Sequence, residues 1–193
     1  MVNALTRDGL RLDLWFHTGD SMTLDPTKVQ VVFDRGDSLH FRPESASTDP
    51  LAAAQRLARQ TQEFWRCMAL LPAVVGRQEL LTAFVGLSVE MNLVTDLLLT
   101  GYGIARERGV KTLNQFLPPE LRQALEAALS LHGLSPVSLT KAHLALARIV
   151  QEQGRLIAAK HQYAYPEELE EVVLSYVSQE LALLELNEEG EGN

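Results

Sequence analysis

An alternating segment near the beginning of the sequence carries side chains that could do chemistry. Apolar residues alternate strictly with a more polar set over residues 10–17, which is typical of a β-strand with two different faces. The second face would carry Arg11, Asp13, Trp15 and His17. A carboxylate held by a strand can bind a metal ion or act as a general base, so Asp13 is the candidate catalytic and metal-binding residue. The alternative is that Asp13 faces solvent and pairs with Arg11.

A second candidate site lies in a long apolar segment, where two acids recur at helical spacing. Glu79, Ala83, Gly86 and Glu90 fall on one line of a helix. Two small residues between two acids predict the floor of an acidic cleft, whose carboxylates would suit a cationic, amine-bearing ligand. The alternative is that the small residues allow close helix packing and the glutamates pair with arginines such as Arg66. Glu79, Glu90 and Arg66 are therefore the candidate substrate-binding residues.

The hydrophobic period changes once along the chain and predicts an α+β, mostly α fold. Residues 9–42 alternate like strands, with Val29–Phe33 as a second strand and Ser38–Arg42 as a third. The segment Asp34–Asp37 between them contains a glycine and is typical of a turn. These patterns predict a small antiparallel sheet of two or three strands.

From Asp49 onward the period is helical and predicts a bundle of about five helices. Two of these helices have clear start signals, because Asp49-Pro50 and Ser135-Pro136 each place a capping side chain before a proline. The expected helices span residues 49–71, 77–108, 120–131, 136–161 and 167–186.

The change of pattern predicts a β-part at residues 1–47 and a helical domain at 48–186, followed by a disordered acidic tail at 187–193. The net charge of −8 is concentrated near the C-terminus, where nine glutamates and no lysine or arginine follow Lys160. The rest of the chain is close to neutral and lacks the basic stripe that a nucleic-acid-binding protein needs. We therefore expect no nucleic-acid partner.

The cysteine content and the hydropathy pattern predict the cellular compartment of the protein. Cys67 is the single cysteine, so an internal disulfide is excluded and a reducing compartment is favoured. The N-terminal residues lack the apolar core of a signal peptide, and we see no apolar run long enough to span a bilayer. These features predict a cytoplasmic protein with no membrane partner.

Six short segments together carry a resemblance to a known family. They are residues 10–17, Lys28–Asp34, Glu63–Arg66, Gly76–Leu81, Leu113–Pro118 and Tyr165–Glu170. In this order and spacing they resemble the second half of bacterial nucleotidyltransferases of the aminoglycoside adenylyltransferase type. The resemblance implies a mixed sheet with three carboxylates that bind Mg²⁺ and position a nucleoside triphosphate. It also implies that the helical domain helps to bind the acceptor, and it makes Asp13 the third carboxylate.

The resemblance further implies a reaction in which an acceptor hydroxyl attacks the α-phosphorus of the nucleotide and pyrophosphate leaves. The family places a Gly-Ser turn and an Asp-x-Asp strand before the third carboxylate, and Met1–Arg7 contains neither. We therefore expect residues 1–47 to be a remnant of a truncated catalytic domain. The alternatives are that another chain supplies the missing part, or that the chain is a degenerate relative kept for binding. The expected protein is nucleotidyltransferase-like, uses a small hydroxyl- or amine-bearing acceptor, and is inactive alone.

Two other functions fit the same sequence. The chain could be a non-enzymatic helical interaction module that forms a homodimer through the edge of Val29–Phe33 or through its acidic terminal helix. The spacing of Arg155 and His161 is also similar to that of HEPN-type ribonucleases, which would require both side chains to face a dimer seam.

Overall fold

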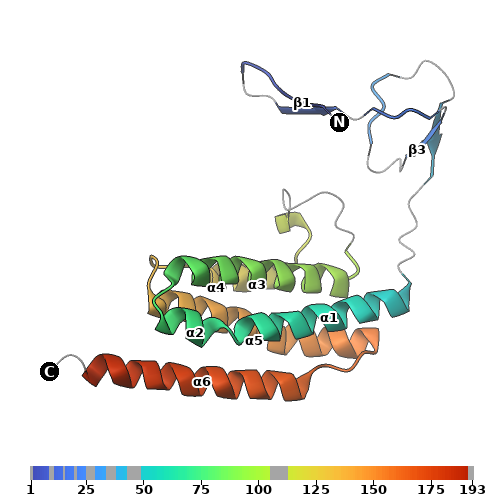
Figure 1. Ribbon diagram of the computed structural model, residues 1–193. Helices are drawn as coiled ribbons and strands as arrows, with labels where there is room; N and C mark the ends of the chain where they lie inside the picture. Colours follow the sequence, from blue (N-terminus) through green and yellow to red (C-terminus); the bar gives the residue numbers. More distant parts are fainter. Residues whose placement is uncertain are drawn as a thin grey trace. The chain divides into compact units, whose positions relative to one another are not determined.

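The computed structural model divides the chain into two compact units, residues 1–47 and residues 48–193. The first unit contains short strands and the second is helical, so the mostly α, α+β fold class is confirmed (Figure 1). The structure describes residues 2–8, 11–14, 16–19, 21–24, 29–33, 38–42, 49–104 and 113–190.

The strands of the first unit form two separate pairs. β1 (Val2–Leu5) pairs antiparallel with β2 (Arg11–Leu14). β3 (Met22–Leu24) pairs in parallel with β4 (Leu39–Phe41). The expectation of one small antiparallel sheet is therefore wrong in this detail. Residues 25–38 connect the second pair, and a connection of that length lets two strands run in the same direction.

The positions of the strands also differ in part from those predicted. β2 and β4 lie within two of the expected segments, but Val29–Phe33 forms no strand. Its apolar, β-branched residues favour a strand locally, yet a strand persists only where a neighbour takes up its backbone hydrogen bonds. Val32 is instead 93% exposed. The predicted turn at Asp34–Asp37 lies outside the described residues.

The two helices with the clearest capping signals begin where the sequence predicts. In α1 (Pro50–Met68), the Asp49 carboxylate accepts a hydrogen bond from the backbone N–H of Leu51 at 3.0 Å. In α5 (Pro136–His161), the Ser135 hydroxyl accepts one from the N–H of Ser138 at 3.1 Å. Each cap satisfies a backbone donor that the helix itself leaves unpaired.

The predicted second helix is shorter than expected, and a short helix that was not predicted comes before it. α2 (Leu71–Gly76) and α3 (Leu80–Gly101) are separated at Gln78, whose φ of 56° is left-handed and cannot continue a helix. Residues 105–112, which include the predicted end of this helix, lie outside the described residues. The remaining elements are η1 (Leu113–Gln115), α4 (Pro119–Ala128) and α6 (Glu167–Gly190).

The core of the helical unit forms where α3 packs against α1 and α5. α4 packs on α5, and α6 packs on α1 and α2. Phe64 and Trp65 of α1 are fully buried, with their rings edge to face and the ring centroids 5.2 Å apart. α3 is long and apolar enough to cross a membrane by length and composition alone, a property that it shares with core helices of bundles.

The packing of α3 on α5 predicts opposite effects of alanine at two α3 glycines. A Cβ at Gly101 would lie 2.5–2.8 Å from three side-chain atoms of Ile157. Gly101→Ala is expected to lower the free energy of unfolding by about 1–3 kcal/mol, because the core is overpacked. A Cβ at Gly86 meets only the His143 ring, at 3.7 Å. Gly86→Ala is expected to raise that free energy by about 0.5–1 kcal/mol, because glycine weakens a helix interior.

Urea unfolding followed by far-UV circular dichroism measures both effects, since the signal is dominated by the helices. Changes of the same sign in the two variants would contradict the described packing of α3 on α5.

Candidate functional site

A shallow, open pocket of about 430 Å³ lies on the surface of the helical unit, between α1 and α3. Its lining is polar on the α1 side and apolar on the α3 side. The lining residues are Arg59, Gln60, Gln62, Glu63 and Arg66 of α1 and Leu93 of α3. The α1 residues gather on one side because their spacings of three, four and seven bring them to one face of a helix. We call this feature the α1–α3 pocket.

The charged groups of the α1–α3 pocket are held loosely. An Arg66 Nη1 atom lies 3.5 Å from a carboxylate oxygen of Glu63, and the two side chains are 73% and 51% exposed. Arg59 donates from Nε to the backbone carbonyl of Gln55 at 3.3 Å. Because such exposed contacts contribute little to the free energy of folding, both guanidinium groups and the carboxylate can turn toward a ligand.

The pocket also contains an amide that lacks a partner. The Oε1 atom of Gln60 is buried and accepts no hydrogen bond from any described residue. An acceptor left unsatisfied in this way favours a donor from outside the protein or a change of side-chain position. The pocket therefore offers guanidinium donors, amide groups and one carboxylate, which suit a small polar molecule with anionic, hydroxyl or amine groups.

The structure places the predicted substrate-binding residues at three different positions. Arg66 lines the α1–α3 pocket. Glu79 is exposed immediately before α3 begins, and it accepts a hydrogen bond from Thr82 Oγ1 at 3.5 Å. Glu90 is only 1% exposed. The two glutamates therefore do not line one open acidic cleft, because the helix starts after Glu79 and the turn of the helix carries Glu90 into the core.

Glu90 forms a buried pair with His143 of α5. Its carboxyl oxygen lies 2.7 Å from His143 Nδ1, and His143 Nε2 lies 3.1 Å from the carbonyl oxygen of Ala83. A carbonyl can only accept, so Nε2 must carry a hydrogen. One further proton is then shared between Nδ1 and the carboxyl group, and the pair is neutral overall. Burial raises the pKa of Glu90 above its ordinary value of 4.5, and the hydrogen bond with His143 offsets only part of this effect.

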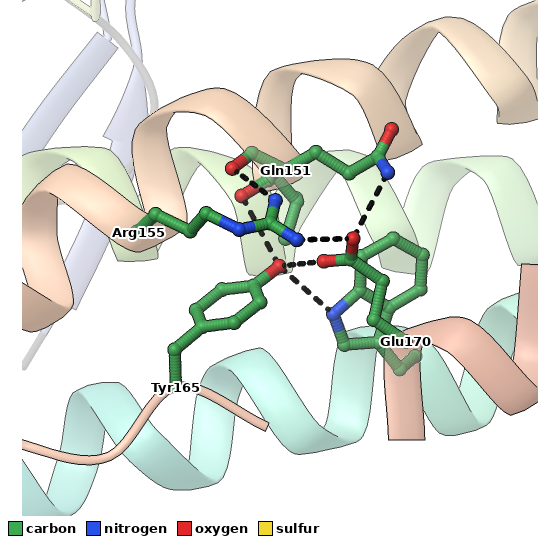
Figure 2. Close-up of polar contacts among 6 residues, drawn as sticks. Gln151, Arg155, Tyr165 and Glu170 are labelled. Atoms are coloured by element: carbon green, nitrogen blue, oxygen red, sulfur yellow. Dashed lines mark hydrogen bonds and ion pairs between the residues drawn. The ribbon is translucent and has the colours of Figure 1, made fainter. Parts of the chain in front are cut away.

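A second buried polar cluster joins three helices and was not foreseen from the sequence. Figure 2 shows Gln151, Arg155 and Tyr165 directed at Glu170 of α6, which is 3% exposed. Gln151 Nε2 and Arg155 Nη2 donate to one carboxylate oxygen at 3.0 and 2.6 Å, and the Tyr165 hydroxyl donates to the other. The indole N–H of Trp65 in α1 donates to that hydroxyl at 3.2 Å.

The cluster stabilises the charged form of Glu170. Burial alone would raise the pKa of this carboxyl group, but the hydrogen bonds from Gln151, Tyr165 and Arg155 outweigh burial and hold the pKa below its ordinary value. The only signal in the sequence is that Tyr165–Glu170 is one of the segments that carry the family resemblance.

The side chains of the other candidate pair, Arg155 and His161, do not meet at a common site. Arg155 is bound to Glu170 of α6, whereas His161 Nε2 lies 2.8 Å from the carbonyl oxygen of Gly101 in α3. Both are engaged in contacts between helices. This arrangement gives no support to the ribonuclease alternative.

Asp13 lies in β2, where its backbone pairs with Asn3 of β1; its side chain lies outside the described residues. Among the residues that the structure describes, no group of three or more His, Cys, Asp or Glu side chains could hold a metal ion. Because the side chain of Asp13 is not among those described, the magnesium site that the resemblance implies stays a prediction.

Comparison with known protein families gives one match. The model of the family described as streptomycin adenylyltransferase matches residues 3–180, a range that includes Asp13 and the α1–α3 pocket. No curated protein and no solved structure matches the chain.

The raised pKa of Glu90 predicts a pH-dependent gain from Glu90→Gln. The folded protein holds a proton on Glu90 more tightly than the unfolded chain does, so the contribution of Glu90 to wild-type stability falls as the pH rises above about 4.5. Glutamine stays neutral and can donate to His143 Nδ1. The stability of Glu90→Gln relative to wild type should therefore increase with pH, as measured by thermal unfolding between about pH 4 and pH 8. A difference that does not vary with pH would contradict this assignment.

The lowered pKa of Glu170 predicts the opposite pH dependence of stability. Because the pKa of Glu170 is lowered on folding, the charged carboxylate stabilises the folded protein at pH values above its ordinary pKa of 4.5. This stabilisation is lost as the pH falls through the pKa of the folded state. Glu170→Gln is expected to lower the free energy of unfolding by about 1–3 kcal/mol near neutral pH, because three donors lose a charged acceptor. The loss should shrink in acid. The same thermal unfolding series tests this, and a constant loss down to the lowest pH would argue against a charged Glu170.

Proposed function

Because the chain belongs to the streptomycin adenylyltransferase family, we propose that its helical unit binds the acceptor of a nucleotidyl transfer. The acceptor is a small molecule that carries hydroxyl or amine groups. The observation that carries the proposal is the family match, which spans the strand with Asp13 and the helices that form the α1–α3 pocket. The chain is thus nucleotidyltransferase-like, and its own residues indicate which part of the reaction it serves.

The chemistry of the α1–α3 pocket supports a role in binding. The Glu63 carboxylate can pair with an ammonium or guanidinium group, and the amides of Gln60 and Gln62 can hydrogen bond to hydroxyls. Arg59 and Arg66 instead favour an anionic group such as a phosphate. Glu63 and Arg66 neutralise each other in the free protein, so each ligand charge must compete with one of them.

The transfer step uses carboxylates that, by the resemblance, lie before Asp13 in the sequence. An acceptor hydroxyl would attack the α-phosphorus as pyrophosphate leaves, and the resemblance assigns three carboxylates to that step. Asp8 is the only acidic residue before Asp13. We infer that Asp13 serves as one of the three and that the chain by itself binds ligands without releasing pyrophosphate.

Isothermal titration with streptomycin and with ATP, each in the presence of Mg²⁺, tests the proposed roles in the α1–α3 pocket. Glu63→Gln is expected to weaken binding of cationic streptomycin about tenfold, as the loss of one charge-assisted hydrogen bond predicts. Arg66→Ala should strengthen it, because Glu63 loses its intramolecular partner. The same Arg66→Ala change should weaken any binding of anionic ATP.

Arg148→Ala is the matched control, because Arg148 is an exposed arginine of α5 outside the pocket. It should change neither affinity. The absence of saturable binding by either ligand would contradict the role of the pocket. Pyrophosphate release that is lost in Asp13→Asn would support Asp13 as a catalytic residue and would contradict the inactivity of the isolated chain.

A further inference from the structure

α3 exposes a continuous apolar strip on the surface of the helical unit. Its apolar members are spaced three or four residues apart, so they follow one face of the helix. They are Leu81, Phe84, Val85 and Val89, which are 72%, 42%, 60% and 45% exposed. Ser88 and Asn92 continue the same face. We call these six residues the α3 strip; the helix that carries them is drawn in green in Figure 1.

The polar members of the α3 strip do not require water or an external partner. Ser88 donates from its hydroxyl to the carbonyl of Phe84 at 3.1 Å, and Asn92 donates from its amide to the carbonyl of Ser88 at 2.8 Å. Both side chains are therefore folded back on their own helix. Such a surface can be covered by an apolar partner with little loss of hydrogen bonding.

The strip is also free of charge. Between Glu79 and Asp96 the only ionisable residue is Glu90, which is buried in the pair with His143. The whole chain carries a net charge of −8, so two copies repel each other at most orientations. An uncharged face is where two such copies can approach without placing like charges together.

We propose that the α3 strip is a homodimer interface, in which α3 packs antiparallel against α3 of a second copy across a two-fold axis. Such an interface is self-complementary, because each strip contacts the same strip of its partner. The inference goes beyond the proposed nucleotidyl-transfer function and does not depend on it.

The size of the α3 strip is sufficient for a modest dimer. Its four apolar side chains expose roughly 400 Å² per copy, if a fully exposed side chain of this size presents about 150–200 Å². With Ser88, Asn92 and their neighbours, two copies together reach the approximately 1,000 Å² at which specific interfaces begin.

The acidic terminal helix offers a poorer surface for self-association. α6 also exposes apolar side chains, among them Val172 and Leu183, at 61% and 54%. However, the exposed Glu168 and Glu171 lie beside Val172. Two copies joined there would bring these carboxylates together, which is unfavourable. On α3 itself, the carboxylate of Glu90 is buried, and the exposed Glu79 lies before the start of the helix.

Size-exclusion chromatography with light scattering tests the proposal on the full chain. The wild-type chain is expected to have twice the mass of one chain, and Val85→Lys should convert it to a monomer, because the substitution places two ammonium groups at the centre of the seam. Val172→Lys is the matched control, since Val172 is an equally exposed helical valine, and it should remain dimeric. A wild-type monomer at the highest soluble concentration, or a dimer that survives Val85→Lys, would overturn the proposal.

Disulfide trapping gives a second test that does not depend on a charged substitution. In a Cys67→Ser background, Ser88→Cys should form a covalent dimer under mild oxidation, whereas Ser175→Cys on exposed α6 should not. Equal cross-linking of the two variants, or none at Ser88→Cys, would place the contact elsewhere and overturn the assignment to α3.

Discussion

The helical unit depends on the packing of α3 against α1 and α5. α3 is apolar around most of its circumference, so burial of one side is what holds the neighbouring helices in place. Trp65 and Leu57 from α1 and Leu146 from α5 fill this core without measurable exposure. The same property leaves an apolar side uncovered, so the helix that stabilises the unit also provides its best surface for a second copy.

Two buried carboxyl groups, Glu90 and Glu170, connect helices across this core by different physical means. Glu90 shares one proton with His143, and burial, which disfavours its charge, raises its pKa. Glu170 is kept charged, because three donors from α5 and the segment before α6 surround it. The contribution of Glu90 to the stability of the unit thus falls as the pH rises, and that of Glu170 falls as the pH decreases.

The α1–α3 pocket lies at the edge of this core, on the outer side of α1 and beside Leu93 of α3. The inner side of α1 is anchored by Phe64 and Trp65, which fixes the direction of the outer side and the spacing of its polar residues. Glu63 belongs to the pocket, whereas the sequence predicts a binding role only for Arg66, its partner one helical turn away. Helical spacing alone could have linked the two, but it could not show that Leu93 of α3 closes the other side.

The amino-acid sequence alone predicts the features that depend on neighbouring residues: the mostly α fold class, the starts of α1 and α5 at their capping residues, and the strand that contains Asp13. Each of these rests on hydrogen bonds or periodicity within a few positions. Other features follow from the folded chain: β3 and β4 are parallel, Val29–Phe33 is not a strand, and Glu90 is buried while Glu79 is exposed. These outcomes depend on partners far along the chain, such as His143 for Glu90, and local spacing does not specify such partners.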